Sequence, residues 1–161
     1  MGSRSSRPVA PAETAQTIPV EPRYEQKKIS VLGKQMAYYE VVARDESGAV
    51  ADPTDTIVFV HGNPTSAYMW RNVMPHCEGP GRRLLAPDLI GYGGSQKLDN
   101  VGDADRYSLK EQSRYFSAFM AAVGVQERVT LVGHSFGGTS SVLASHRLPL
   151  AGTDLSPPPP Q

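Results

Sequence analysis

One short segment of the sequence has the residue types and spacing of a covalent catalyst. Residues 133–137 read GHSFG, a G-x-S-x-G pattern, directly after an apolar run at 128–133 that predicts a buried strand and before a predicted helix at 139–147. A serine in such a strand–turn–helix is held in a strained backbone conformation with its hydroxyl exposed, and the N-terminus of the following helix favours negative charge beside it. The pattern therefore predicts that Ser135 is a nucleophile.

The sequence around this serine alternates predicted strands and helices. Apolar runs at 56–60 and 82–88 predict two more buried strands, and Ser108 with Glu111 forms a capping box at the start of a helix that Gly124 ends. Strands that alternate with helices form a mostly parallel sheet, so the predicted fold class is α/β. Two further strands are predicted at 28–33 and 36–43, where they form a hairpin. A short helix that a proline ends is predicted at 66–76.

The composition argues against several classes of function. The chain has 161 residues with 16 basic and 16 acidic side chains, and its net charge of zero argues against binding nucleic acid through a broad basic surface. A single cysteine, Cys77, excludes an internal disulfide and a multi-cysteine metal site. No apolar run reaches the roughly 18 residues of a membrane span. We expect a cytoplasmic protein that uses no metal and no cofactor.

Both ends of the chain are rich in proline and lack hydrophobic periodicity. The predicted organisation is a disordered tail at 1–27, a folded domain at 28–148 and a second, proline-rich disordered tail at 149–161. Two alternatives remain for the first tail: Gly2 and Ser6 fit an N-myristoylation pattern, and the bias towards Arg and Ser suits an organelle transit peptide. The consecutive prolines of the second tail could instead present a polyproline II ligand to a partner.

Three segments together resemble a known family. They read HGNPTSAYMWRNVMPH at 61–76, APDLIGYGGS at 86–95 and LVGHSFGG at 131–138. Their order and spacing are similar to those of the α/β-hydrolase fold, in its haloalkane dehalogenase and epoxide hydrolase branch. The resemblance covers residues 28–147 and implies the N-terminal half of such a protein.

The resemblance also implies roles for residues around Ser135. The backbone N–H groups of Asn63 and Phe136 would form the oxyanion hole, and the Asn63 side chain matches one that helps to hold halide in the dehalogenases. Asp88 follows a predicted strand and is expected to bond local backbone and fix the glycine-rich loop after it. The residues implied to support the turn and the oxyanion loop are His61, Gly62, Gly133 and Gly137.

Two positions depart from the dehalogenase pattern. That branch carries Asp where this chain has Ser135, and the dehalogenases carry a halide-binding Trp where this chain has Phe136, which has no N–H to donate. A carboxylate that displaces a leaving group from an sp³ carbon forms an ester that water can cleave, whereas a serine would form a stable ether. The departures therefore favour acyl transfer on a small ester, thioester or lactone over dehalogenation or epoxide hydrolysis. The resemblance leaves the related carbon–carbon and perhydrolase reactions of serine members as alternatives.

A further departure concerns the catalytic acid and histidine, which the family places far downstream of the nucleophile. The candidates after Ser135 are His146 and Asp154. His146 lies about 16 Å further along the predicted helix, too far to bond the serine hydroxyl, and Asp154 falls in the predicted tail. The chain is expected to lack its general base, the cap domain and its last three strands. The strand at 128–133 is then left as an open apolar edge.

Two hypotheses follow for the function. In the first, the chain is the N-terminal part of a serine-type hydrolase with Ser135 as its nucleophile. In the second, the chain is a truncated, catalytically inactive form that binds a protein partner through its open sheet edge. Weak residual hydrolysis supported by the oxyanion hole alone is a third outcome, so whether the chain is itself an enzyme stays open.

Overall fold

The computed structural model describes residues 23–99, 101–125 and 127–145. Most of the first predicted tail and all of the second lie outside these residues, as do His146 and Asp154. The first strand begins at Gln26, two residues before the predicted start of the folded domain. No helix in the described ranges is long and apolar enough to cross a membrane.

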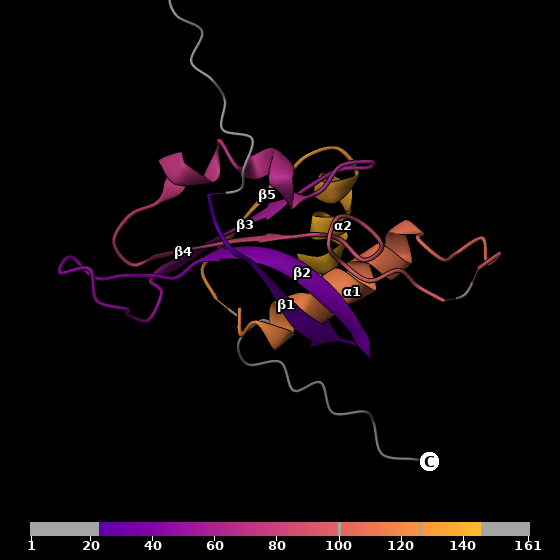
Figure 1. Cartoon of the computed structure of the whole chain (residues 1–161), viewed down its shortest axis with the longest axis horizontal. Helices are drawn as coiled ribbons and strands as arrows, with labels where there is room; N and C mark the ends of the chain where they lie inside the picture. The colour runs from indigo at the N-terminus through magenta and orange to yellow at the C-terminus, as the bar shows by residue number, and fades with distance from the viewer. Residues whose placement is uncertain (1–22, 100, 126, 146–161) are drawn as a thin grey trace, which may run out of the picture.

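A five-stranded sheet forms the centre of the molecule, with the strand order β1-β2-β4-β3-β5 (Figure 1). β1 and β2 pair antiparallel, β2 pairs antiparallel with β4, and β3 pairs parallel with both β4 and β5. The sheet is thus mixed, with a parallel part that carries the predicted buried strands, and the α/β fold class is confirmed. The strands are β1 (Gln26–Val31), β2 (Lys34–Val41), β3 (Asp55–Val60), β4 (Arg82–Pro87) and β5 (Val129–Gly133).

The register of β3 and β5 decides where the predicted nucleophile lies. Val60 pairs with Gly133, so the two strands end side by side at the same edge of the sheet. The segments that follow them, starting at His61 and His134, therefore leave the sheet as neighbours although about 70 residues of chain separate them.

Two helices cover one face of the sheet. α1 (Leu109–Ala122) and α2 (Phe136–Ser145) lie together on this face in Figure 1, and a cluster of buried side chains that includes Phe116, Phe119 and Met120 fills the space between helices and sheet. α2 begins three residues earlier than predicted, because only two residues separate the end of β5 from the helix.

The predicted cap of α1 is present, although only half of the expected reciprocal box forms. Ser108 Oγ accepts a hydrogen bond from the Glu111 N–H at 3.3 Å. The Glu111 carboxylate accepts two bonds from Arg114, at 3.0 and 2.6 Å, in place of the bond back to the Ser108 N–H that a capping box requires. Gly124 ends the helix with a φ of +70°, in the left-handed region that favours glycine.

The other face of the sheet is covered by two short 3₁₀ turns, drawn in magenta in Figure 1. They are η1 (Ala67–Trp70) and η2 (Met74–Cys77), so the prediction of one helix at 66–76 that a proline ends was wrong. Pro75 lies in the first turn of η2, where its missing N–H costs no intrahelical bond. Trp70 and Met74 pack there against Phe59, Leu84 and other buried residues of the strands.

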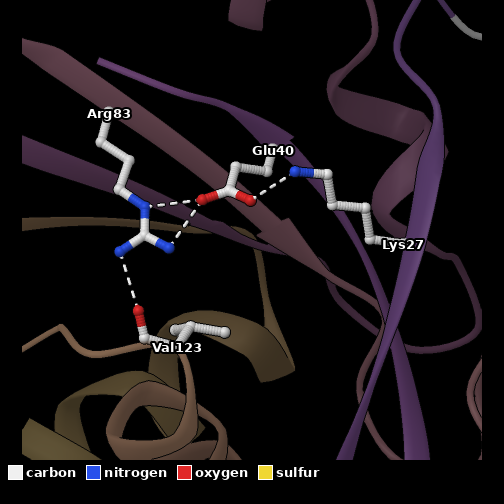
Figure 2. A network of polar contacts seen from close by, with 4 residues as sticks. All are labelled: Lys27, Glu40, Arg83 and Val123. Atoms are coloured by element: carbon white, nitrogen blue, oxygen red, sulfur yellow. Dashed lines mark hydrogen bonds and ion pairs between the residues drawn. The ribbon is translucent and has the colours of Figure 1, made fainter. Parts of the chain in front are cut away.

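A network of charged side chains ties three strands to the end of α1 (Figure 2). Glu40 of β2 accepts bonds from Lys27 of β1 at 2.8 Å and from Arg83 of β4 at 2.8 and 2.6 Å. Arg83 also donates to the carbonyl oxygen of Val123 at 2.8 Å. This last bond satisfies one of the carbonyls that a helix C-terminus leaves without an intrahelical partner.

Candidate active site

Ser135 occupies the sharp turn between β5 and α2. Its φ is +53°, a left-handed conformation that is rare for residues other than glycine, and its side chain is exposed. The His134 N–H donates to the Val60 carbonyl at 3.0 Å, and the Gly138 N–H donates to the Ser135 carbonyl at 3.0 Å. The strained, exposed serine that the sequence pattern predicts is therefore present.

The glycines of the turn are required by close backbone approach. A Cβ atom on Gly133 would lie 2.3 Å from Gly138 Cα, and one on Gly137 would lie 2.2 Å from the His61 carbonyl oxygen. Both distances are far below any real Cβ contact and both involve backbone, which cannot move aside. Gly133 lets β5 meet the start of α2, and Gly137 lets α2 meet the segment after β3.

The segment after β3 is the one that the sequence predicts to help hold an oxyanion, and we therefore call residues 61–65 the oxyanion loop. It lies against the serine turn, by which we mean residues 133–138. A Cβ atom on Gly62 would lie 2.8 Å from the His134 carbonyl oxygen and 3.1 Å from Ser135 Cβ. Asn63 follows directly, is exposed, and precedes Pro64 through a cis peptide bond. Phe136 is the first residue of α2, a position whose N–H has no acceptor within the helix. The structure thus brings together Ser135, the loop that contains Asn63, and the N-terminus of α2.

His61 is buried, and its two ring nitrogens form hydrogen bonds with backbone atoms. Its Nδ1 bonds the Gly62 carbonyl oxygen at 2.8 Å, so Nδ1 carries the proton, and Nε2 accepts a bond from the Leu89 N–H at 2.9 Å. Burial lowers the pKa of His61, against smaller raising effects of the Gly62 carbonyl and of Asp88. A neutral imidazole with both nitrogens engaged cannot serve Ser135 as a base, and it links the oxyanion loop to the end of β4.

Asp88 also connects segments beside the turn. Its carboxylate is buried and accepts bonds from the Gly94 N–H at 2.7 Å, from the Ala67 N–H at 2.7 Å and from Gln26 Nε2 at 3.1 Å. The bond to Gly94 fixes the glycine-rich loop, as predicted from the sequence. The bonds to Ala67 and Gln26 were not predicted, because no sequence spacing indicates contacts with η1 and β1.

The Ser135 hydroxyl has no hydrogen-bond partner among the residues that the structure describes. The neighbouring His134 ring is exposed and lies near Gly62, with Nδ1 3.0 Å from the position of a Gly62 Cβ. Within the same ranges, no three His, Cys, Asp or Glu side chains are grouped as a metal site would require. Two surface hollows of about 320 and 270 Å³ lie beyond the C-terminal end of β2, at the edge of the sheet opposite the serine turn.

Comparisons with known proteins agree with this architecture. A model of the alpha/beta hydrolase fold matches residues 55–150. A haloalkane dehalogenase from Sphingobium indicum is 46% identical over 117 residues, which are 73% of this chain and 36% of the relative. A haloalkane dehalogenase from Mycolicibacterium smegmatis is 50% identical over 106 residues, which are 66% of this chain and 30% of the relative.

Solved structures show the same relationship. The crystal structure of haloalkane dehalogenase DbeA from Bradyrhizobium elkani is 35% identical with a TM-score of 0.62, over 78% of this chain and 38% of that one. DatA from Agrobacterium tumefaciens is 34% identical with a TM-score of 0.61, over 76% of this chain and 36% of that one. The chain thus spans about a third of the length of these relatives. Family match, strand order and serine turn lead to one conclusion: the chain belongs to the α/β-hydrolase fold family, in its haloalkane dehalogenase-like branch.

Proposed function

We propose that this chain carries the nucleophile of a serine-type hydrolase that acts by acyl transfer on small ester-like molecules. The observation that carries the proposal is the conformation of Ser135, with a φ of +53° and an exposed side chain between β5 and α2. Strain at a non-glycine residue persists only where the surrounding structure holds it, and it concentrates at functional sites. Leu32 and Arg128 share this conformation, each with a φ of +49°, but of the three residues only Ser135 has a nucleophilic side chain.

In the proposed reaction, Ser135 Oγ attacks the carbonyl carbon of the substrate and its proton passes to a general base. The negative charge then develops on the former carbonyl oxygen, where the N–H groups of Phe136 and Asn63 would stabilise it. The N-terminus of α2 adds a favourable electrostatic field at the same place. Loss of the leaving group gives an acyl-serine ester, which water cleaves to regenerate the hydroxyl.

The general base of this reaction is not among the described residues. None of them bonds the Ser135 hydroxyl, and His61 has both nitrogens engaged by backbone. The base would come from chain outside the described ranges or from another polypeptide. This leaves a second candidate function, a catalytically inactive protein that binds a partner at β5, which pairs with β3 alone among the described strands.

Haloalkanes are an alternative substrate class, because the relatives are named haloalkane dehalogenases. We rank it below acyl transfer because of the chemistry of Ser135: displacement of halide by a hydroxyl gives an alkyl ether, which has no carbonyl for water to attack. Halide release from 1-bromobutane, measured over many turnovers, should stay at the background rate. Sustained release that Ser135→Ala abolishes would contradict acyl transfer as the sole chemistry.

A fluorophosphonate probe tests the proposed nucleophile, because an active serine displaces its fluoride and gains a mass that intact-protein spectrometry detects. We expect the wild-type chain to be labelled once and the Ser135→Ala variant to remain unlabelled. Ser30→Ala is the matched control, since Ser30 is also exposed but lies in the regular strand β1. It should label at the wild-type rate.

The same experiment separates the two candidate functions. A chain that is folded by circular dichroism but unlabelled at Ser135 would contradict hydrolase activity of the chain on its own and favour the partner-binding function. A Ser135→Ala variant that is labelled at the wild-type rate would likewise remove Ser135 from the proposed role.

A further inference from the structure

The carbonyl oxygen of Gly62 has an unusual number of hydrogen-bond donors. His61 Nδ1 bonds it at 2.8 Å, the Thr65 N–H at 3.0 Å and the Thr65 hydroxyl at 2.8 Å. A carbonyl oxygen has two lone pairs, so three donors saturate it and fix its direction. The donors come from the residue before this carbonyl and from a residue three positions after it, so the peptide plane between Gly62 and Asn63 is restrained at its carbonyl oxygen.

The fixed carbonyl also fixes the Asn63 N–H. The peptide bond between Gly62 and Asn63 is planar and trans, so its N–H points opposite to its C=O. The carbonyl is turned towards His61 and Thr65, while the α-carbon of Gly62 abuts the serine turn, with a Cβ position 3.1 Å from Ser135 Cβ. Rotation of this plane would redirect the N–H that is proposed to face the developing oxyanion.

Thr65 restrains the Gly62 carbonyl through its hydroxyl group and not through packing of its side chain. The side chain is exposed, so its packing contributes little. Its hydroxyl has one proton and two acceptors within reach, the Gly62 carbonyl at 2.8 Å and Met69 Sδ at 3.4 Å. The carbonyl oxygen is nearer and is the stronger acceptor, so the proton goes to Gly62.

We propose that Thr65 is a positioning residue: together with His61 it clamps the Gly62 carbonyl and thereby aims the Asn63 N–H at the oxyanion formed on Ser135. This inference rests on the proposed function, because the oxyanion that the Asn63 N–H would face forms only if Ser135 reacts. His61 is anchored in turn by the Leu89 N–H at the end of β4, so the clamp is connected to the sheet.

The clamp can be observed in the unreacted protein. Gly62-Asn63 is the only Gly-Asn pair in the sequence, so carbonyl-¹³C glycine with ¹⁵N-asparagine labelling gives a single HNCO peak that reports the Gly62 carbonyl and the Asn63 N–H together. We expect Thr65→Val, which keeps the shape and removes the donor, to shift this peak. Thr65→Ser, which keeps the hydroxyl donor, should leave the peak close to its wild-type position.

The functional effect is measured as the rate of fluorophosphonate labelling at Ser135. We expect Thr65→Val to slow labelling about tenfold and Thr65→Ser to stay within about twofold of wild type, with unchanged thermal midpoints. A Thr65→Val peak that superimposes on the wild-type peak, or a wild-type labelling rate in Thr65→Val, would overturn the clamp. If the wild-type chain is not labelled, the proposed function falls, and the peak position alone then supports or overturns the clamp.

Discussion

At the scale of single residues, the serine turn requires glycine, which has no Cβ atom, at three positions. Gly62, Gly133 and Gly137 each sit where a Cβ atom would strike backbone of the facing segment. Their sequence pattern could be recognised in advance, since G-x-S-x-G after a strand has few other uses. The bonds of Thr65 and of Asp88 could not, because their partners become neighbours only in the folded chain.

Gly137→Ala tests the close approach of α2 to the oxyanion loop. The added Cβ would lie 2.2 Å from the His61 carbonyl oxygen and 2.5 Å from that of Val60. We expect a loss of about 2–3 kcal/mol in the free energy of unfolding, measured by urea denaturation, together with loss of labelling at Ser135. Gly79→Ala is the control, because its Cβ would come no closer than 3.7 Å to a flexible arginine, and it should be nearly neutral. Equal losses in both variants would contradict the steric explanation.

At the scale of elements, the sequence predicted what local patterns determine. Every strand was located within two residues, and the cap at Ser108 was found, because period, β-branching and capping are properties of adjacent residues. The helix at 66–76 was predicted wrongly: the segment forms two short 3₁₀ turns, and these bury Trp70 and Met74 against the sheet. The Glu40 network was also missed, as it joins three strands and one helix that only the fold brings together.

Glu40→Gln tests whether this network fastens α1 to the sheet. Burial raises the pKa of the Glu40 carboxyl, but Lys27 and Arg83 outweigh that effect and hold it below its ordinary value of 4.5. A carboxyl with a lowered folded-state pKa contributes stability above about pH 4.5 and loses it as the pH falls through the folded-state pKa. We therefore expect the variant to be about 2 kcal/mol less stable at pH 7 and to approach wild type as the pH falls through the lowered pKa of Glu40.

The measurement is the free energy of unfolding from urea titrations between pH 3 and pH 7, with hydrogen exchange at the end of α1 as a local probe. Glu46→Gln, on an exposed loop, is the control and should run parallel to wild type. A constant difference between Glu40→Gln and wild type across this pH range would contradict the charge-based explanation.

At the scale of the whole molecule, the two edge strands of the sheet, β1 and β5, differ in charge. β1 carries Lys27 and Lys28, charges of the kind that keep edge strands from pairing with other chains. β5 reads VTLVG, has no charge, and leaves Val129, Leu131 and Val132 half-buried. Among the described strands it pairs only with β3, so this edge is where we expect association with a second polypeptide.

Thr130→Lys tests that expectation, because Thr130 is exposed in the middle of β5 and a charge there opposes strand pairing. Analytical ultracentrifugation over a range of concentrations should show association of the wild-type chain and a larger monomer fraction for the variant. Ser30→Lys places the same charge on β1, where lysines are already present, and should leave the association unchanged. A wild-type chain that is monomeric at every concentration would rule out self-association through β5.

The pairing of Val60 with Gly133 also bears on the order in which the molecule folds. In the sequence, β4 and α1 lie between β3 and β5. The contact that joins the oxyanion loop to the serine turn therefore closes a loop of about 70 residues. Closing so long a loop costs more chain entropy than forming the β1–β2 hairpin, and such non-local contacts form slowly. We therefore expect the turn that holds Ser135 to form late in folding, and detachment of β5 alone would disassemble it while β1, β2 and β4 remain paired.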